Sequence, residues 1–423
     1  MAAIPRRRFW FGLGAFGLCA VTPLLTWYVL ADRIPPLPAG IDRDQYRQTL
    51  CELRGQGSKV PDHEAVLCQL GEDAARAGRW EAAFRCFDQI PAQHPRYGHL
   101  MVYEKGQILI QQQRLTEAET NLREFLRLEQ LAPQMKREYS VVTKQYLSYL
   151  LAVELRFEER QQLLSEMIQR GEAQTFEVLA WCFPTLLEWN SPHAAWRVEQ
   201  AWQIDPAKVR LGVALARYRI GQGRLPESRL ILARCLELSP HDLEAKAALC
   251  AYHFEQNAWS EMALLIADLP PIQDSEPWLL LKLRGHFHEH QQRYPEAIDC
   301  YRRALRVDPA SAESQLGLAR ALAATGAEHE NQKALAASQG LARIQNKLGW
   351  SVQNPDRIEP LLEIAQICEQ INLLQQGWLV TGVALRKAPN HQELLQLKAR
   401  LVQEHTEREH QERVPRPEAS NGR

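Results

Sequence analysis

The hydrophobic and polar positions of this chain recur at a fixed spacing through its middle. Three consecutive windows, Thr175–Lys208, Val209–Asp242 and Leu243–Glu276, start 34 residues apart (209 − 175 and 243 − 209). Pro206 and Pro240 close the first two windows. A fixed period in this range predicts a repeat array in which each unit is a pair of helices joined by a turn.

One equivalent position of successive repeats holds a small residue every time, and we call this set of positions the small-residue column. Two antiparallel helices that cross closely need small side chains where they meet. A second column, in the second helix, is less faithful, since Arg160 and Met262 interrupt it. The first column consists of Gly71, Gly106, Ser148, Cys182, Ala216, Cys250, Gly285, Ala319 and Ala365.

The window Glu64–Ala92 has Gly71 and Ala83 at the predicted helix crossing and Phe87 to fill the gap to the next helix. This pattern resembles the tetratricopeptide repeat (TPR), and the window Trp278–Ser311 shows it again. The resemblance covers residues 62–400 in about nine repeats. It implies an all-α fold, a right-handed α-solenoid of helix-turn-helix repeats, and a function in binding a protein or peptide.

Several segments depart from the regular period. Pro184 should kink or shorten the first helix of the fourth repeat. Residues 325–332 look like an enlarged turn, and Leu335–Leu348 like a long second helix. Gln392–Glu404 is predicted to be a capping helix. The polar segment 401–423 is expected to be a disordered tail.

The N-terminus has the pattern of a membrane anchor. Residues 1–8 are basic, and residues 9–31 form an uncharged run of 23 residues, which as a helix spans about 34 Å. Because arginines before a span stay in the cytoplasm, we expect a single-pass protein with its array exoplasmic or periplasmic. Residues 32–61 form a linker with a Pro-rich start. The alternative is a signal peptide cleaved near Ala31, which would give a secreted protein.

Composition narrows the classes of function. The chain is 45% hydrophobic and 24% charged, with a formal net charge of −1. This charge argues against non-specific binding to nucleic acid. The nine cysteines form no CxxC pair. We interpret Cys235, Cys250 and Cys300 as small core residues on packed columns.

The sequence holds no phosphate-binding loop, nucleophile elbow, HExxH or kinase motif. We therefore expect that the protein is not an enzyme and that it binds no cofactor and no small-molecule substrate. His286 and His290 lie one helical turn apart and could share a metal, with His253 in the preceding repeat. The alternative, which we favour, is a polar helix face without a metal site.

In TPR proteins that bind extended peptides, first-helix residues beside the small column face the concave groove. We expect an apolar or aromatic segment of the partner against the first half and an acidic segment against the second. Alternatively, the basic residues pair with acids such as Glu244 and Glu289. The resemblance implies this groove set: Gln145, Tyr149, Leu179, Phe183, Val213, Arg217, Ala247, Ala251, Lys282, His286, Leu316 and Arg320.

Two functions stay open on the sequence alone. The first is a membrane-anchored scaffold that holds a protein or peptide in its groove. The second is a structural subunit of a cell-envelope complex, which would assemble through its convex face or its terminal repeats.

Overall fold

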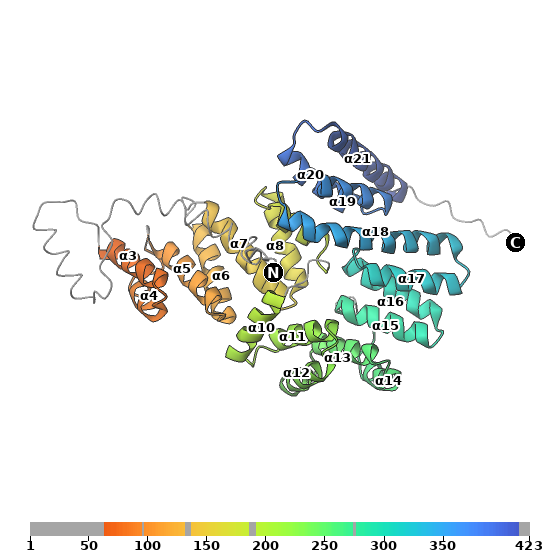
Figure 1. The fold of residues 1–423 in the computed structure, drawn as a ribbon, viewed down its shortest axis with the longest axis horizontal. Helices are drawn as coiled ribbons and strands as arrows, with labels where there is room; N and C mark the ends of the chain where they lie inside the picture. Colours follow the sequence, from red (N-terminus) through yellow and green to blue (C-terminus); the bar gives the residue numbers. More distant parts are fainter. Residues whose placement is uncertain (1–62, 95–96, 132–136, 186–191, 274–275, 414–423) are drawn as a thin grey trace, which may run out of the picture. The chain divides into compact units, whose positions relative to one another are not determined.

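The computed structural model describes residues 63–94, 97–131, 137–185, 192–273 and 276–413 (Figure 1). Across these ranges the chain forms nineteen α-helices and no β-strand. None of the helices in the described part is long and apolar enough to cross a membrane. The basic segment 1–8, the expected span 9–31 and the linker 32–61 lie outside the described residues.

Eighteen helices alternate along the sequence as the first (A) and second (B) helix of nine repeats, and α21, Gln392–Arg413, follows them. This agrees with the predicted all-α repeat array. The A helices are α3 (His63–Arg76), α5 (Gly98–Gln111), α7 (Arg137–Val153), α9 (Thr175–Cys182), α11 (Val209–Gly221), α13 (Leu243–Glu255), α15 (Trp278–His290), α17 (Ala312–Ala324) and α19 (Glu359–Gln370). The B helices are α4 (Trp80–Phe87), α6 (Leu115–Leu131), α8 (Phe157–Gln169), α10 (Pro192–Ile204), α12 (Leu225–Leu238), α14 (Trp259–Ala267), α16 (Tyr294–Val307), α18 (Glu328–Gln353) and α20 (Leu374–Lys387).

In the repeats α3–α4, α5–α6 and α15–α16, the small-residue column lies where the two helices cross. All nine of its members are buried, as predicted. A Cβ atom on Gly71 would overlap the Phe87 ring, and one on Gly285 would lie only 2.6 Å from the Tyr301 ring. The aromatic ring of helix B therefore occupies the space that a larger residue of helix A would need.

Eight A–B turns in the described ranges share one backbone arrangement. Each places a residue in the left-handed region, seven positions after the small residue, as 78 follows 71 and 292 follows 285. The next residue donates its N–H to a carbonyl five positions earlier, as Arg224 does to Arg219 at 2.9 Å. This is the Schellman arrangement that ends an α-helix. The left-handed residues are Gly78, Gln113, Leu155, Gly223, Asn257, Gln292, Gly326 and Asn372.

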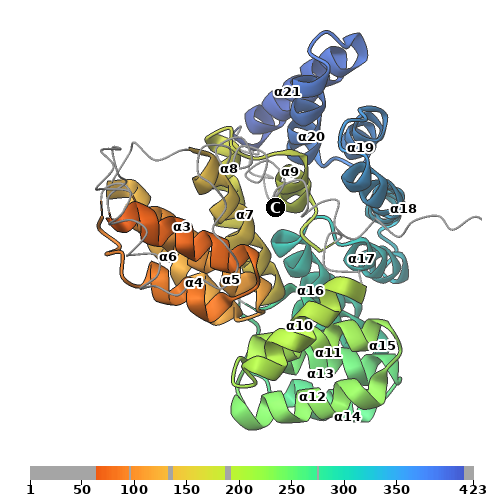
Figure 2. The ribbon, with the colours of Figure 1, turned by 60° about the vertical axis from the view of Figure 1, so that its left-hand side comes forward.

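The fourth repeat departs from the others as Pro184 predicts. Helix α9 ends at Cys182 after only eight residues, because the residue before a proline disfavours helical backbone. Within the second unit, α9 contacts α18 and α20 as well as α8 (Figure 2). The Cys182 thiol lies 3.9 Å from the Gln376 carbonyl oxygen, and the Thr185 hydroxyl donates to Asp308 at 2.6 Å.

Two expectations about the C-terminal third are wrong. Residues 325–332 are not an enlarged turn, since α18 begins at Glu328 and continues for 26 residues. Helix α21 runs to Arg413 instead of ending at Glu404, so residues 401–413 are helical and not disordered. Polar side chains one helical turn apart support both segments. Gln332 donates to Glu328 at 3.0 Å, and Gln403 to Glu407 at 2.8 Å.

The chain divides into two compact units, Met1–Leu150 and Leu151–Arg423. The first has its core around Phe87 and Phe125, both fully buried. The second has successive cores centred on buried residues such as Leu232, Met262 and Tyr301. Each unit is thus a series of small inter-repeat cores, as expected for a solenoid.

Candidate functional site

The twelve predicted groove residues lie in two columns, three positions before and one position after each small residue. Four of them are core residues in the structure. Leu179, Phe183, Val213 and Ala247 are each at most 1% exposed, so they do not face a partner. The short helix α9 contacts α8, α18 and α20, and most of its side chains are buried, although Phe176 is exposed.

The remaining predicted residues divide between the two units. Gln145 and Tyr149 are half-buried in the first unit. In the second, the column after the small residue reaches the surface most consistently, since Arg217, Ala251 and His286 are half-buried and Arg320 is exposed. Leu316 is exposed as well, whereas Lys282 is buried.

The basic residues among them pair with acids, which is the alternative that the sequence left open. Arg217 lies 3.4 Å from Glu244, and Lys282 pairs with Glu313. Arg217 and Lys282 also lie over the ring of Trp278, at 5.5 and 5.2 Å from its centroid. An acidic partner segment would have to displace these carboxylates. Its binding stays a prediction.

A chain of hydrogen bonds links α15, α16 and α17. His286 Nδ1 lies 2.8 Å from the Tyr301 hydroxyl, which donates to Glu289 at 2.7 Å. Arg320 Nε and Nη2 reach the two Glu289 oxygens at 2.6 and 3.0 Å. Burial raises the pKa of Glu289, but its contacts with His286, Arg320 and Tyr301 outweigh burial and lower that pKa to about 2. Glu289 is therefore an ionised carboxylate held by protein donors.

Two ring stacks lie beside this chain of hydrogen bonds. Trp259 and His290 stack face to face, with centroids 4.0 Å apart and an interplanar angle of 5°. Phe254 and His286 stack at 4.8 Å and 27°. Together these groups line an open cavity of about 460 Å³ across α13–α17, which we call the aromatic pocket. Its lining residues are Phe254, Trp259, His286, Glu289, His290, Tyr294, Arg320 and Ala324.

The sequence identified His286 and Arg320 in this pocket but missed its rings. Trp259 and Tyr294 each open a B helix, nine positions after the small residue of their repeat (259 − 250 and 294 − 285). This recurring aromatic position was a usable signal. Phe254 lies four positions after Cys250, on the same face of α13.

The histidines are engaged by their neighbours rather than by one another. His286 contacts Tyr301 and Phe254, His290 stacks on Trp259, and His253 packs edge-on against Tyr252. Among the residues that the structure describes, no three His, Cys, Asp or Glu side chains come together as metal ligands would.

The cysteines pack as core residues. Cys235, Cys250 and Cys300 are at most 1% exposed, which confirms the interpretation from sequence. Burial is the main cause that raises their thiol pKa values, to about 11, 12 and 12 respectively. Thiols with raised pKa values are poor nucleophiles at neutral pH. The seven cysteines in the described ranges are free thiols.

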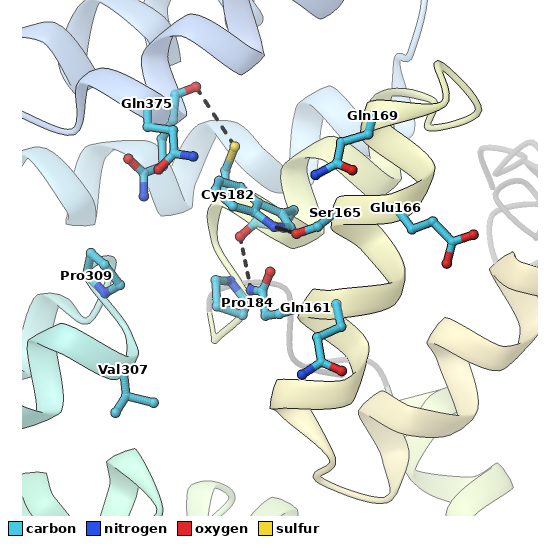
Figure 3. A pocket seen from close by; sticks show the side chains of 12 residues that line it. Gln161, Ser165, Glu166, Gln169, Cys182, Pro184, Val307, Pro309 and Gln375 are labelled. Carbon is cyan, nitrogen blue, oxygen red and sulfur yellow. Dashed lines mark hydrogen bonds between the residues drawn. The ribbon is translucent and has the colours of Figure 1, made fainter. Parts of the chain in front are cut away.

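A second cavity, of about 530 Å³, lies between α8, the end of α9, the end of α16 and the start of α20 (Figure 3). The Trp181 indole donates to Ser165 at 2.7 Å, and Gln161 donates to the Trp181 carbonyl at 3.1 Å. The early end of α9 before Pro184 leaves this space. Glutamines such as Gln161, Gln169 and Gln375 share its wall with apolar side chains, including those of Trp181 and Val307.

Comparisons with known proteins identify the repeat. Sequence profiles described as "Tetratricopeptide repeat" and "TPR repeat" match residues 68–139 and 290–326 respectively. These two segments therefore match the tetratricopeptide repeat. No curated protein sequence matches the chain.

Solved structures resemble the chain only distantly. The APC/C hetero-tetramer Cut9–Hcn1 is 12% identical with a TM-score of 0.32, covering 84% of this chain and 66% of that one, just under two thirds. YrrB, titled a TPR protein with an unusual peptide-binding site, is 14% identical with a TM-score of 0.27, covering 48% and 97%. PilF of Pseudomonas aeruginosa is 13% identical with a TM-score of 0.29, covering 57% and 95%. Likenesses this weak give no information on a partner.

Proposed function

We propose that this TPR protein binds an extended segment of a partner protein across α13–α17, with an apolar or aromatic side chain in the aromatic pocket. The observation that carries the proposal is the pair of ring stacks, Trp259–His290 and Phe254–His286, around an open cavity of about 460 Å³. A volume in this range is typical of ligand pockets.

The electrostatics of the pocket favour an uncharged side chain. Glu289 and Arg320 neutralise each other through two hydrogen bonds. A charged ligand group would compete with this pair, and breaking it would leave the half-buried Glu289 carboxylate without its partner. The exposed His290 ring and the half-buried Tyr294 ring line the pocket and can contact a ligand. Stacking of one more ring contributes about 0.5–1.5 kcal/mol beyond its buried area.

A random-peptide phage library, selected on the detergent-solubilised full chain, tests the proposal. We expect enriched peptides to carry an aromatic residue at a fixed position. His290→Ala and Tyr294→Ala should each weaken such peptides about tenfold, the equivalent of about 1.4 kcal/mol. His329→Ala, at an exposed histidine of α18, is the control. Binding that survives both pocket variants would contradict the proposal.

We further propose that residues 9–31 anchor the chain in a membrane, with the basic residues 1–8 in the cytoplasm and the array on the other side. The length of the uncharged run and the arginines before it support this orientation. The groove would then meet proteins of the exoplasmic or periplasmic space.

Assembly through the terminal repeat is a second candidate function. It is favoured by Leu395 and Val402 of α21, which are 42% and 47% exposed. Exposed apolar side chains gathered on one helix face mark interaction surfaces.

A further inference from the structure

Helix α21 continues the repeat register beyond the ninth repeat. Ala399 follows Ala365 by 34 positions (399 − 365) and takes the place of the small residue. Arg400 donates Nε and Nη2 to Glu369 at 2.7 and 2.9 Å, the same pairing that Arg320 makes with Glu289. One side of α21 is buried where it meets α19 and α20, through Leu394, Leu397 and Leu401. Helix α21 is therefore the A helix of a tenth repeat.

The face of α21 that should receive a helix B is uncovered. In earlier repeats a helix-B residue sixteen positions after the small residue covers it, as Phe87 covers Gly71. Ala399 is exposed instead, together with Leu395 and Val402 one turn to either side.

Residues 403–413 continue α21 and do not turn back onto this face. The turn of a tenth repeat would fall at Thr406, seven positions after Ala399, yet α21 continues through it to Arg413. The uncovered surface, which we call the α21 face, comprises Leu395, Ala399 and Val402. Trp378 of α20 is 42% exposed beside it, with Lys398 Nζ at 5.8 Å from its ring centroid.

We propose that the α21 face binds the α21 face of a second copy of this chain, antiparallel and about a two-fold axis near Ala399. This goes beyond the groove proposal and does not depend on it. The face is self-complementary, because Leu395 lies four positions before Ala399 and Val402 three positions after it. An antiparallel copy therefore places Leu395 against Val402 of the second copy, and Val402 against Leu395 of the second copy.

The small residue allows the two helices to approach as the helices of one repeat do. The A–B crossings at Gly71, Gly106 and Gly285 are centred on a small residue, and Ala399 supplies one to both copies. A helix of 22 residues spans about 33 Å, which is long enough for contacts on both sides of the axis. The two-fold contact is closed, so it predicts dimers and not filaments.

Sedimentation velocity of the detergent-solubilised full chain tests the dimer. We expect a concentration-dependent dimer for the wild type. Leu395→Glu together with Val402→Glu should weaken it about a hundredfold or more, because each carboxylate would be buried without a partner. The matched control is Leu230→Glu together with Leu264→Glu, two side chains that are 75% exposed on α12 and α14. A wild type that stays monomeric at every concentration, or a dimer that survives the α21 variant, overturns the proposal.

A cysteine variant decides the case if the glutamate variant does not fold. Ala399→Cys places one thiol close to the two-fold axis in each copy. Oxidation by copper phenanthroline should link the two copies through a 399–399 disulfide, whereas Leu264→Cys should stay unlinked. Equal linking of both variants, or no linking of Ala399→Cys, contradicts the arrangement.

Discussion

At the scale of single residues, the turn positions with positive φ are those where the amino acid present fits its backbone conformation least well. Gln292 is exposed with φ of 60°, a conformation that costs an L-residue about 1–2 kcal/mol. We predict that Gln292→Gly stabilises its repeat by about 0.5–1 kcal/mol, after the larger entropy loss of glycine is subtracted. Hydrogen exchange of α15 and α16 measures the change.

The reverse substitution is the matched control. Gly223 has φ of 70°, and a Cβ added there would meet no neighbour within 4 Å, so Gly223→Ala adds backbone strain without a clash. It should destabilise its repeat by about 1 kcal/mol. Equal and same-signed effects of the two substitutions would show that backbone conformation does not determine stability at these turns.

The carboxylate of Glu289 makes local stability depend on pH. Its folded-state pKa is lowered from 4.5 to about 2, so its contribution is complete above pH 4.5 and is lost as the pH falls towards 2. With solvent screening we expect about 1–2 kcal/mol. Glu289→Gln should remove this pH dependence from α15–α17, as followed by hydrogen exchange. Parallel pH profiles of variant and wild type would contradict the assignment.

At the scale of helices, the small-residue column should determine how closely each pair packs. Ala216 is fully buried in a cluster with Val213 and Leu232. We predict that Ala216→Leu overpacks the α11–α12 crossing and costs about 1–3 kcal/mol. Because each repeat is coupled only to its neighbours, amide hydrogen exchange should also become faster in α10 and α13 but not in more distant repeats. An unchanged unfolding curve would contradict the register.

Helix pairs and their crossings could be predicted from sequence because one 34-residue period fixes both. The early end of α9 could be predicted as well, because the residue before Pro184 disfavours helical backbone. The start of α18 at Glu328 and the extension of α21 to Arg413 could not, because polar segments between apolar runs read equally well as turns or as exposed helices. Side-chain pairs one turn apart decide such cases.

The candidate site was predicted only in part. The register named His286 and Arg320, which line the aromatic pocket, but could not show that Val213 and Ala247 are buried against the adjacent repeat. The rotation between successive repeats determines whether the residues before or after the small-residue column stay exposed. No single repeat encodes this rotation. The pairing of Arg320 with Glu289, 31 residues earlier in the chain, depends on the same rotation.

At the scale of the whole molecule, the proposed anchor gives the array a defined side of the membrane. We predict that protease added to intact spheroplasts digests the repeats, because Arg6–Arg8 precede the uncharged run and stay inside. Immunoblotting against the array measures this, and a cytoplasmic marker protein must stay intact as the control. Repeats that are digested only after lysis would reverse the orientation.

The central claim is that a partner segment lies in the aromatic pocket, and site-specific photocrosslinking in the producing cells tests it most directly. p-Benzoylphenylalanine replaces His290 in one variant of the full chain and Leu264, exposed on α14, in another. We expect the same partner protein to be crosslinked at position 290 and not at position 264. Crosslinking to that partner at position 264 alone would contradict it and would place binding on the B helices.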